Sequence, residues 1–220
     1  MKALAGYEER TSLRDGKMLC LKYLHSDTNK ERVYMKVIGF VGSPRKSGNT
    51  AWIVNKILEG AGEKGAEAAV WYSGELDIGA CKGCLGCVQR DRCVIEDDMQ
   101  KIYDSLKSAD AVILGSPVYM GQMSAQAKLF TDRLFAQITP RFSPHFKEGN
   151  TGKKLILVFT QGNPDKSIFQ PYYDYTEKMF KMLEFDVKEM VIVAGMRKEA
   201  AKDRQDLHVA LKEIGAGLTV

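Results

Sequence analysis

Short apolar runs alternate with segments of helical periodicity from residue 36 onward. The runs are rich in Val, Ile and Leu, and they predict five β-strands, over residues 36–42, 66–72, 110–116, 154–160 and 186–195. Between them, apolar residues recur at i, i+3, i+4 and i+7, as amphipathic helices require. These positions are Val54, Ile57, Leu58 and Ala61, then Met99, Ile102, Tyr103 and Leu106, then Ala127, Phe130 and Leu134. Two later helices are expected, over residues 168–183 and 199–215.

Strands that are almost continuously apolar are typical of a parallel sheet covered by helices on both faces. Right-handed crossovers between five such strands predict a flavodoxin-like, doubly wound α/β fold with strand order 2-1-3-4-5. In this fold, ligands bind beyond the carboxyl ends of the strands. The loops to consider therefore follow residues 41, 116 and 160, and we expect Ser116-Pro117 to stop the third strand.

Residues 1–34 do not share this alternation, and we interpret them as an N-terminal extension. A single domain is expected over residues 35–220, with Met35 directly before its first strand. The fifth cysteine of the chain, Cys20, lies in the extension and receives no role.

Composition narrows the class of protein. The 220 residues are 45% hydrophobic and 27% charged, which allows a buried core without disulfide bonds. Lys and Arg number 32 against 28 Asp and Glu, and the two signs are interspersed, so no nucleic-acid partner is expected. No apolar run reaches the about 18 residues of a membrane span, and the N-terminus lacks the apolar core of a secretory signal. We expect a cytoplasmic protein with no membrane partner, in which clustered cysteines bind metal or do chemistry.

The segment after the first strand, GFVGSPRKSGNTAWIV, has the composition of an anion site. Gly42 and Gly48 permit backbone conformations closed to other residues, and amides at a helix N-terminus attract phosphate. The residues expected to bind it are Ser43, Arg45, Ser47, Gly48, Asn49 and Thr50, with additional charge from Lys46. Asn49 replaces the lysine of a triphosphate P-loop, and Pro44 replaces the second glycine of a dinucleotide fingerprint. A mononucleotide phosphate fits best, which in a flavodoxin-like sheet indicates FMN.

Two further loops are expected at the flavin ring. After the third strand, an apolar turn offers backbone groups to the polar edge of the ring and side chains to its faces. Its residues are Pro117, Val118, Tyr119, Met120 and Gly121. Ordinary turn chemistry explains the polar turn after the fourth strand almost as well as flavin binding does. That turn contains Gln161, Gly162 and Asn163. Asp132 and Arg133, inside a helical segment, are expected to serve packing or an ion pair.

Four of the five cysteines lie within thirteen residues, CKGCLGCVQRDRC, with the spacing C-x2-C-x2-C-x5-C. They are Cys81, Cys84, Cys87 and Cys93. Structural zinc usually takes two ligand pairs that lie far apart in sequence, and a single dithiol would leave two cysteines unexplained. The compact C-x2-C-x2-C part is similar to the way ferredoxins fold three thiolates around a cubane cluster. Gly83 and Gly86 leave room for the backbone to curl, and the last cysteine is placed to close the fourth corner.

Three segments in this order resemble the iron-sulfur flavoproteins, a group among the NADPH-dependent FMN reductases of the flavodoxin-like superfamily. They are GSPRKSGNT, CKGCLGCVQRDRCVIEDDM and SPVYMGQMSAQAKLFTDR. The resemblance spans about residues 35–195, and the four-cysteine motif is its specific element. It implies FMN in the three loops and a [4Fe-4S] cluster held by Cys81, Cys84, Cys87 and Cys93.

The resemblance also implies partners. It implies a homo-oligomer, a dimer or tetramer, with each cluster near a subunit interface. Electrons would come from a donor such as reduced ferredoxin and would pass through the cluster and FMN to a small acceptor such as dioxygen or peroxide. Lys82, Arg90 and Arg92 flank the cysteines; two roles are open for them, to attract an acidic ferredoxin, or to offset the charge of the cluster or face solvent. Two alternatives remain open: an NAD(P)H-dependent FMN or quinone reductase without a cluster, and a flavodoxin-like electron carrier without turnover.

Overall fold

The computed structural model describes residues 34–90, 92–137 and 152–219. Apart from position 34, the expected N-terminal extension lies outside the described residues, and so does Cys20. The strands are β1 (Lys36–Val41), β2 (Glu67–Tyr72), β3 (Ala111–Tyr119), β4 (Gln122–Met123), β5 (Lys154–Thr160) and β6 (Asp186–Val193). The α-helices are α1 (Asn49–Glu63), α2 (Gly86–Arg90), α3 (Met99–Ser108), α4 (Ala125–Arg133), α5 (Gln170–Met182) and α6 (Gln205–Gly217). Short 3-10 helices are η1 (Ser73–Glu75), η2 (Leu134–Gln137), η3 (Lys166–Phe169) and η4 (Ala201–Asp203).

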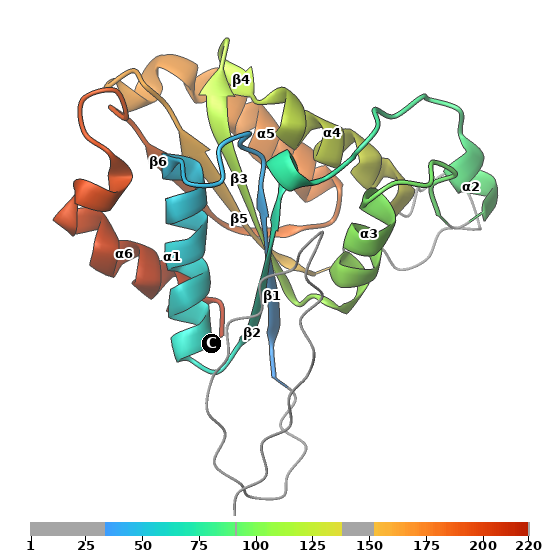
Figure 1. Ribbon diagram of the computed structural model, residues 1–220, viewed down its shortest axis with the longest axis horizontal. Coiled ribbons are helices and arrows are strands. Elements are labelled where there is room, and N and C mark those ends of the chain that lie inside the picture. The colour runs from blue at the N-terminus through green and yellow to red at the C-terminus, as the bar shows by residue number, and fades with distance from the viewer. Residues whose placement is uncertain (1–33, 91, 138–151, 220) are drawn as a thin grey trace, which may run out of the picture.

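Five parallel strands form one sheet in the order β2-β1-β3-β5-β6 (Figure 1). With the short β4 left out of the count, this is the expected flavodoxin-like order 2-1-3-4-5, and that prediction is confirmed. β1 lies between its neighbours with Val41 opposite Tyr72 on one side and Gly115 on the other. Pro117 of β3 lies opposite Thr160 of β5. The carboxyl ends of β1, β3 and β5 are therefore adjacent, and so are the three loops that follow them.

Helices cover both faces of the sheet, as its apolar strands predict. α1 and α6 pack on one face, where Val54 and Ile57 are fully buried. α3, α4 and α5 cover the other face, where the rings of Phe40 and Phe130 stack with centroids 4.2 Å apart. All the apolar positions expected on the first three helices are buried, although Leu134 lies just past α4. Within the described ranges, no helix is both long enough and apolar enough to cross a bilayer.

The third strand is longer than the sequence predicts. Instead of stopping at Ser116-Pro117, β3 continues to Tyr119 and pairs antiparallel with β4. Met120 and Gly121 have φ of 49° and 80°, which makes the two-residue turn whose twist suits a hairpin. A β-hairpin therefore stands at the carboxyl edge of the sheet, at the top of Figure 1, where we expected a loop.

Candidate functional site

The segment between β1 and α1 presents backbone donors at a helix N-terminus. Gly48 is the N-cap of α1, no side chain caps it, and the first turn contains no acidic residue. The amides of this turn are therefore open to an anion, which the positive end of the helix dipole also favours. Ser43 is buried, and its Oγ accepts a hydrogen bond from the amide of Arg45 at 3.2 Å, which curls the loop. This geometry fits the predicted phosphate.

Gly42 and Gly48 provide space here, not unusual backbone angles. Neither has a positive φ, and the φ of Gly48 is −81°. A Cβ on Gly42 would lie 2.5 Å from the Cβ of Ala127, so this loop packs directly on α4. Ser124, the N-cap of α4, donates its hydroxyl to the carbonyl of Gly42. The conformational role expected for these two glycines is therefore wrong. Close packing requires glycine at position 42, whereas a Cβ on Gly48 would lie 3.2 Å from the carbonyl oxygen of Arg45.

Direct hydrogen bonds join the ends of the three strands that the candidate loops follow. The amide of Gly42 donates to the carbonyl of Gly115 at 2.7 Å, which connects β1 to β3. The hydroxyls of Thr50 and Thr160 lie 2.7 Å apart, which connects α1 to β5. The structure thus brings the loops at residues 43–50, 117–121 and 161–163 to one edge.

Two of the predicted flavin-binding side chains are already engaged within the protein. Asn49 Oδ1 accepts from the amide of Ala201 at 3.0 Å. Gln161 is 2% exposed, and its Nε2 donates to the carbonyls of Asn163 and Asp165. Gln161 therefore offers a ligand backbone groups only, whereas Asn49 still has its side-chain nitrogen for a ligand.

Apolar side chains gather at the hairpin. Tyr119 and Met120 are exposed at its tip, and the ring of Phe169 lies 3.5 Å from where a Cβ on Gly121 would be. The hydroxyl of Tyr172 accepts from the amide of Met123, which ties the hairpin to α5. Exposed apolar surface beside an anion site suits a flat heterocycle that carries a phosphate.

The two cations of the phosphate loop differ in their surroundings. Lys46 Nζ lies 2.6 Å from a carboxylate oxygen of Glu75 and 5.0 Å from the ring centroid of Tyr72. Its hydrogen bond to Glu75 raises the pKa of Lys46. Arg45 makes no ion pair with any other described residue. Arg45 is therefore the cation left for a phosphate.

Arg45→Ala is expected to weaken FMN binding about 10- to 150-fold, because a charge-assisted hydrogen bond contributes about 1.5–3 kcal/mol. Lys46→Ala is the matched control. Glu75 already balances the charge of Lys46, so this change is expected to alter affinity less than about threefold. Titration of FMN with the apoprotein of each variant, monitored by the quenching of flavin fluorescence, measures both dissociation constants. Equal losses in the two variants would argue against the assignment to Arg45.

The cysteine loop leaves β2 and returns at α3. Figure 1 shows α2, within this loop, beyond α3 at one end of the molecule. Cys81 and Cys84 are exposed, Cys87 is half-buried and Cys93 is buried. The last two pack against the core beneath α3 and α4. The exposure of the thiols therefore decreases along the loop, from Cys81 and Cys84 to Cys93.

The four thiols share one region, although they do not form a finished metal site. Burial raises the pKa of the Cys87 thiol, and the charges of Cys93, Cys81 and Cys84 raise it further. The other three thiols are therefore within electrostatic range of Cys87. Among the described side chains, no three of His, Cys, Asp or Glu are gathered closely enough to hold a metal ion. In number and type the four thiols fit an iron–sulfur cluster, which takes four thiolates. In this structure they are not close enough together to bind a single metal ion.

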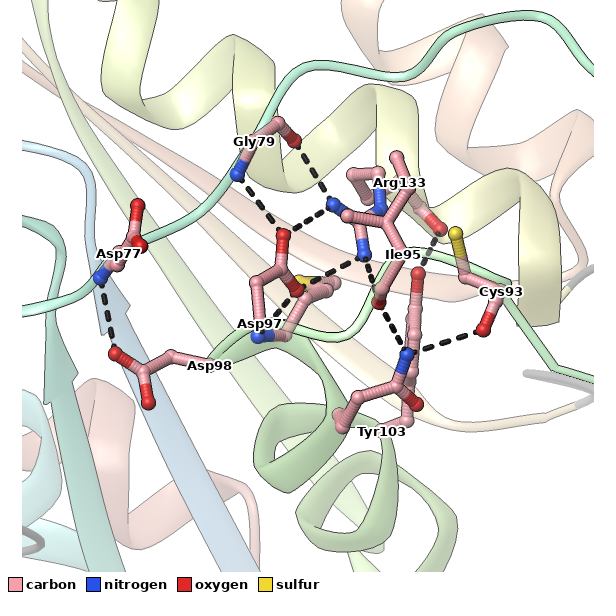
Figure 2. Close-up of polar contacts among 10 residues, drawn as sticks. Asp77, Gly79, Cys93, Ile95, Asp97, Asp98, Tyr103 and Arg133 are labelled. Carbon is pink, nitrogen blue, oxygen red and sulfur yellow. Dashed lines mark hydrogen bonds and ion pairs between the residues drawn. The ribbon is translucent and has the colours of Figure 1, made fainter.

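The sequence did not reveal which residue holds the two ends of the cysteine loop together. Arg133 of α4 is 1% exposed and donates to both carboxylate oxygens of Asp97, at 2.6 and 3.0 Å (Figure 2). The ion pair expected for Arg133 is therefore present, with a partner 36 residues away. Asp132, by contrast, pairs with Lys128 on the surface of α4. The only sign of this ion pair in the sequence was the acidic pair Asp97 and Asp98 before α3, and such a pair is equally typical of a helix N-cap.

Residues 35–168 match the family model of NADPH-dependent FMN reductase. The chain belongs to this family. An iron-sulfur flavoprotein of Methanocaldococcus jannaschii is 32% identical over 162 residues, which cover 73% of this chain and 76% of that protein. An iron-sulfur flavoprotein of Methanosarcina thermophila is 42% identical over 99 residues, which cover 45% of this chain and 52% of that protein. The match thus spans about half the length of the second relative.

A solved structure shares the fold of this member of the FMN reductase family. It is an NAD(P)H:quinone oxidoreductase from Methanothermobacter marburgensis, with a TM-score of 0.64 and 16% sequence identity. The alignment covers 84% of this chain and 98% of that chain. Family membership places the protein among the flavin-dependent oxidoreductases that use FMN. The structural likeness supports the flavodoxin-like fold.

Proposed function

We propose that this protein is an iron-sulfur flavoprotein that takes electrons from an external donor at a [4Fe-4S] cluster and passes them to FMN. The observation that carries the proposal is the set of four thiols on one loop, Cys81, Cys84, Cys87 and Cys93, on a domain with a separate FMN-type phosphate loop. A reductase that receives hydride at the flavin has no use for a second ligand set. Four clustered thiolates suit one-electron chemistry.

FMN, when bound, supplies chemistry in steps of one or two electrons. The amides at the start of α1 and Arg45 would hold its phosphate. Residues 117–121 of the hairpin would contact the ring, and residues 161–163 would offer backbone groups to its polar edge. Tyr119 and Met120 would shield one side of the ring from water. The acceptor is a small molecule such as dioxygen or peroxide, admitted at this edge.

The cysteine loop would hold a cluster that supplies a one-electron site near the protein surface. Cys81 and Cys84 are on its solvent side, while Cys87 and Cys93 are on the side of α3 and α4. Electrons therefore enter from the exposed rim.

The rim of the cysteine loop suits an acidic donor protein such as reduced ferredoxin. Leu85 is 59% exposed and has a φ of 58°, a rare combination for a branched apolar residue. Lys82 and Arg90 are exposed on the same loop and make no ion pair with another described residue. Arg92 is partly committed, because it bonds Gln100 at 2.8 Å. An apolar contact flanked by free cations favours an acidic partner.

A homo-oligomer, dimer or tetramer, completes the proposal. In one chain, α2 lies at an end of the molecule, well separated from the start of α1 (Figure 1). Contact between the cysteine loop of one subunit and the hairpin of another would shorten the path for electrons. The oligomer is thus proposed to pair the two cofactors across its interface.

Anaerobic purification, followed by analysis of iron, acid-labile sulfide and flavin, tests the proposal. We expect about four iron, four sulfide and one FMN per chain. Stopped-flow absorbance is expected to show fast flavin reduction by reduced ferredoxin and slow reduction by NADPH. Zinc in place of iron, or metal-free protein from an anaerobic preparation, would contradict the cluster.

The second candidate is an NAD(P)H-dependent FMN or quinone reductase without a cluster. The family match and the open arrangement of the thiols favour it. In that case NADPH alone would reduce the flavin rapidly, and replacement of a cysteine would leave this rate unchanged. A carrier without turnover would accept electrons and pass none to dioxygen, peroxide or a quinone.

A further inference from the structure

We infer that Arg133 is the positioning residue of the cysteine loop, because it fastens both ends of the loop to α4 and so sets the thiols for metal binding. The inference rests on the proposed function for the identity of the metal group. The positioning itself rests on contacts within the chain.

One guanidinium holds both ends of the loop. At the incoming end, Arg133 Nη1 donates to the carbonyl of Gly79 at 2.8 Å. At the outgoing end, the guanidinium binds the carboxylate of Asp97, and its Nη2 reaches the carbonyl of Ile95 at 3.4 Å (Figure 2). Asp97 in turn accepts from the amide of Gly79 at 2.9 Å. The two ends are therefore joined to each other and to α4.

Two further pairs of hydrogen bonds hold the ends of the cysteine loop in place. The amide of Asp98 donates to the carbonyl of Asp77 at 3.0 Å, and the amide of Asp77 donates to the Asp98 carboxylate at 2.9 Å. Gln100 Nε2 donates to the carbonyls of Cys93 and Ile95 at 3.0 and 2.6 Å. The chain between these fixed ends carries all four cysteines of the motif.

The innermost cysteine lies against the same cluster of residues. Cys93 is 9% exposed, and the hydroxyl of Tyr103 donates to the carbonyl of Arg133 at 2.8 Å. Burial lowers the pKa of Arg133, but the bond to Asp97 and the charges of Tyr103 and Cys93 raise it above its ordinary value. The Cys93 sulfur is therefore within electrostatic reach of the guanidinium.

Stability alone does not account for this arrangement. Arg133 Nε is buried and has no hydrogen-bond partner among the described residues. A buried ion pair that leaves a donor unpaired stabilises a fold no better than apolar packing of the same volume. What the pair provides that apolar residues cannot is a fixed relation between three backbone segments, the incoming end, the outgoing end and α4.

Reconstitution of the full chain with limiting iron and sulfide tests the inference. Arg133→Lys keeps the charge but cannot bridge two carbonyls and both carboxylate oxygens at once. We expect it to keep FMN at the wild-type stoichiometry and to bind iron about tenfold more weakly, as when residues that orient metal ligands are changed. Asp132→Asn is the matched control, since it alters a surface ion pair at the adjacent position of α4. It is expected to bind iron like the wild type.

Alkylation of the cluster-free chain reports positioning with no metal present. Mass spectrometry is expected to show Cys93 reacting about tenfold faster in Arg133→Lys, beyond what its change in global stability predicts. Cys81, which is exposed, serves as the internal reference, and Asp132→Asn is expected to leave both rates unchanged.

The outcomes separate the inference from the proposed function. Wild-type iron binding and alkylation in Arg133→Lys would overturn the inference, and so would loss of FMN together with iron. An increase in Cys93 alkylation no larger than global unfolding explains would also overturn it, because Arg133 would then act on stability alone. If the wild type binds no iron but Arg133→Lys still exposes Cys93, the cluster is excluded and the positioning role stands.

Discussion

Replacing Cys87 with alanine is expected to abolish iron–sulfur binding while FMN stays bound. Cys87 lies on α2 with its side chain against the core, so its replacement removes one of the four proposed ligands from the inner part of the loop. The proposed flavin contacts come from the loops after β1, β3 and β5, which contain no cysteine. The anaerobic visible spectrum should therefore lose the broad cluster absorbance and keep the flavin bands.

Cys20→Ala is the control for Cys87→Ala, because it removes a thiol outside the motif. Iron, sulfide and FMN are expected to stay at wild-type amounts in this control. Loss of both cofactors in Cys87→Ala would show that the two sites depend on each other and that their separation is wrong. Full iron content in Cys87→Ala would remove that cysteine from the ligand set.

Gly215→Ala is expected to destabilise the domain by about 3 kcal/mol, as an overpacked core does. α6 crosses α1 so closely that a Cβ on Gly215 would lie 1.8 Å from the carbonyl oxygen of Ile57. The same crossing leaves no room at Gly60, where a Cβ would lie 2.0 Å from the carbonyl oxygen of Lys212. Backbone atoms cannot turn aside as a side chain can, so the helices must separate. Urea denaturation followed by circular dichroism measures the loss.

Gly217→Ala is the matched control on the same helix. A Cβ at this position would meet no atom within 4 Å, and alanine favours a helix over glycine by about 1 kcal/mol. We therefore expect stability equal to or slightly above that of the wild type. If Gly215→Ala unfolds at the same urea concentration as Gly217→Ala, the close crossing of α1 and α6 is refuted.

Local pattern was enough to predict the elements and their order. The apolar runs marked five parallel strands because a strand buried on both faces has no polar side to show. Right-handed crossovers then indicated the flavodoxin-like order, and the carboxyl edge followed from it. The cysteine spacing pointed to a metal-binding loop without reference to the fold, since all four candidate ligands lie within thirteen residues.

Turn geometry and side-chain partners went beyond what local pattern could predict. The β3–β4 hairpin depends on a positive φ at Met120, a conformation that propensity disfavours for this residue type. Asn49 and Gln161 resembled ligand-binding residues by type, but their partners are the amide of Ala201 and carbonyls of their own loop. Composition shows that a polar side chain needs a partner and does not show which one it takes.

The sequence by itself therefore determined the fold class, the edge that carries the candidate flavin site and the cysteines proposed as the second site. Only the tertiary structure decided what holds these parts in place. Arg133 meets Asp97, Gly42 packs on Ala127, and Gly215 lies against Ile57, each between elements far apart along the chain. Periodicity records which face of an element is buried, whereas the residue that meets that face is decided when the elements pack.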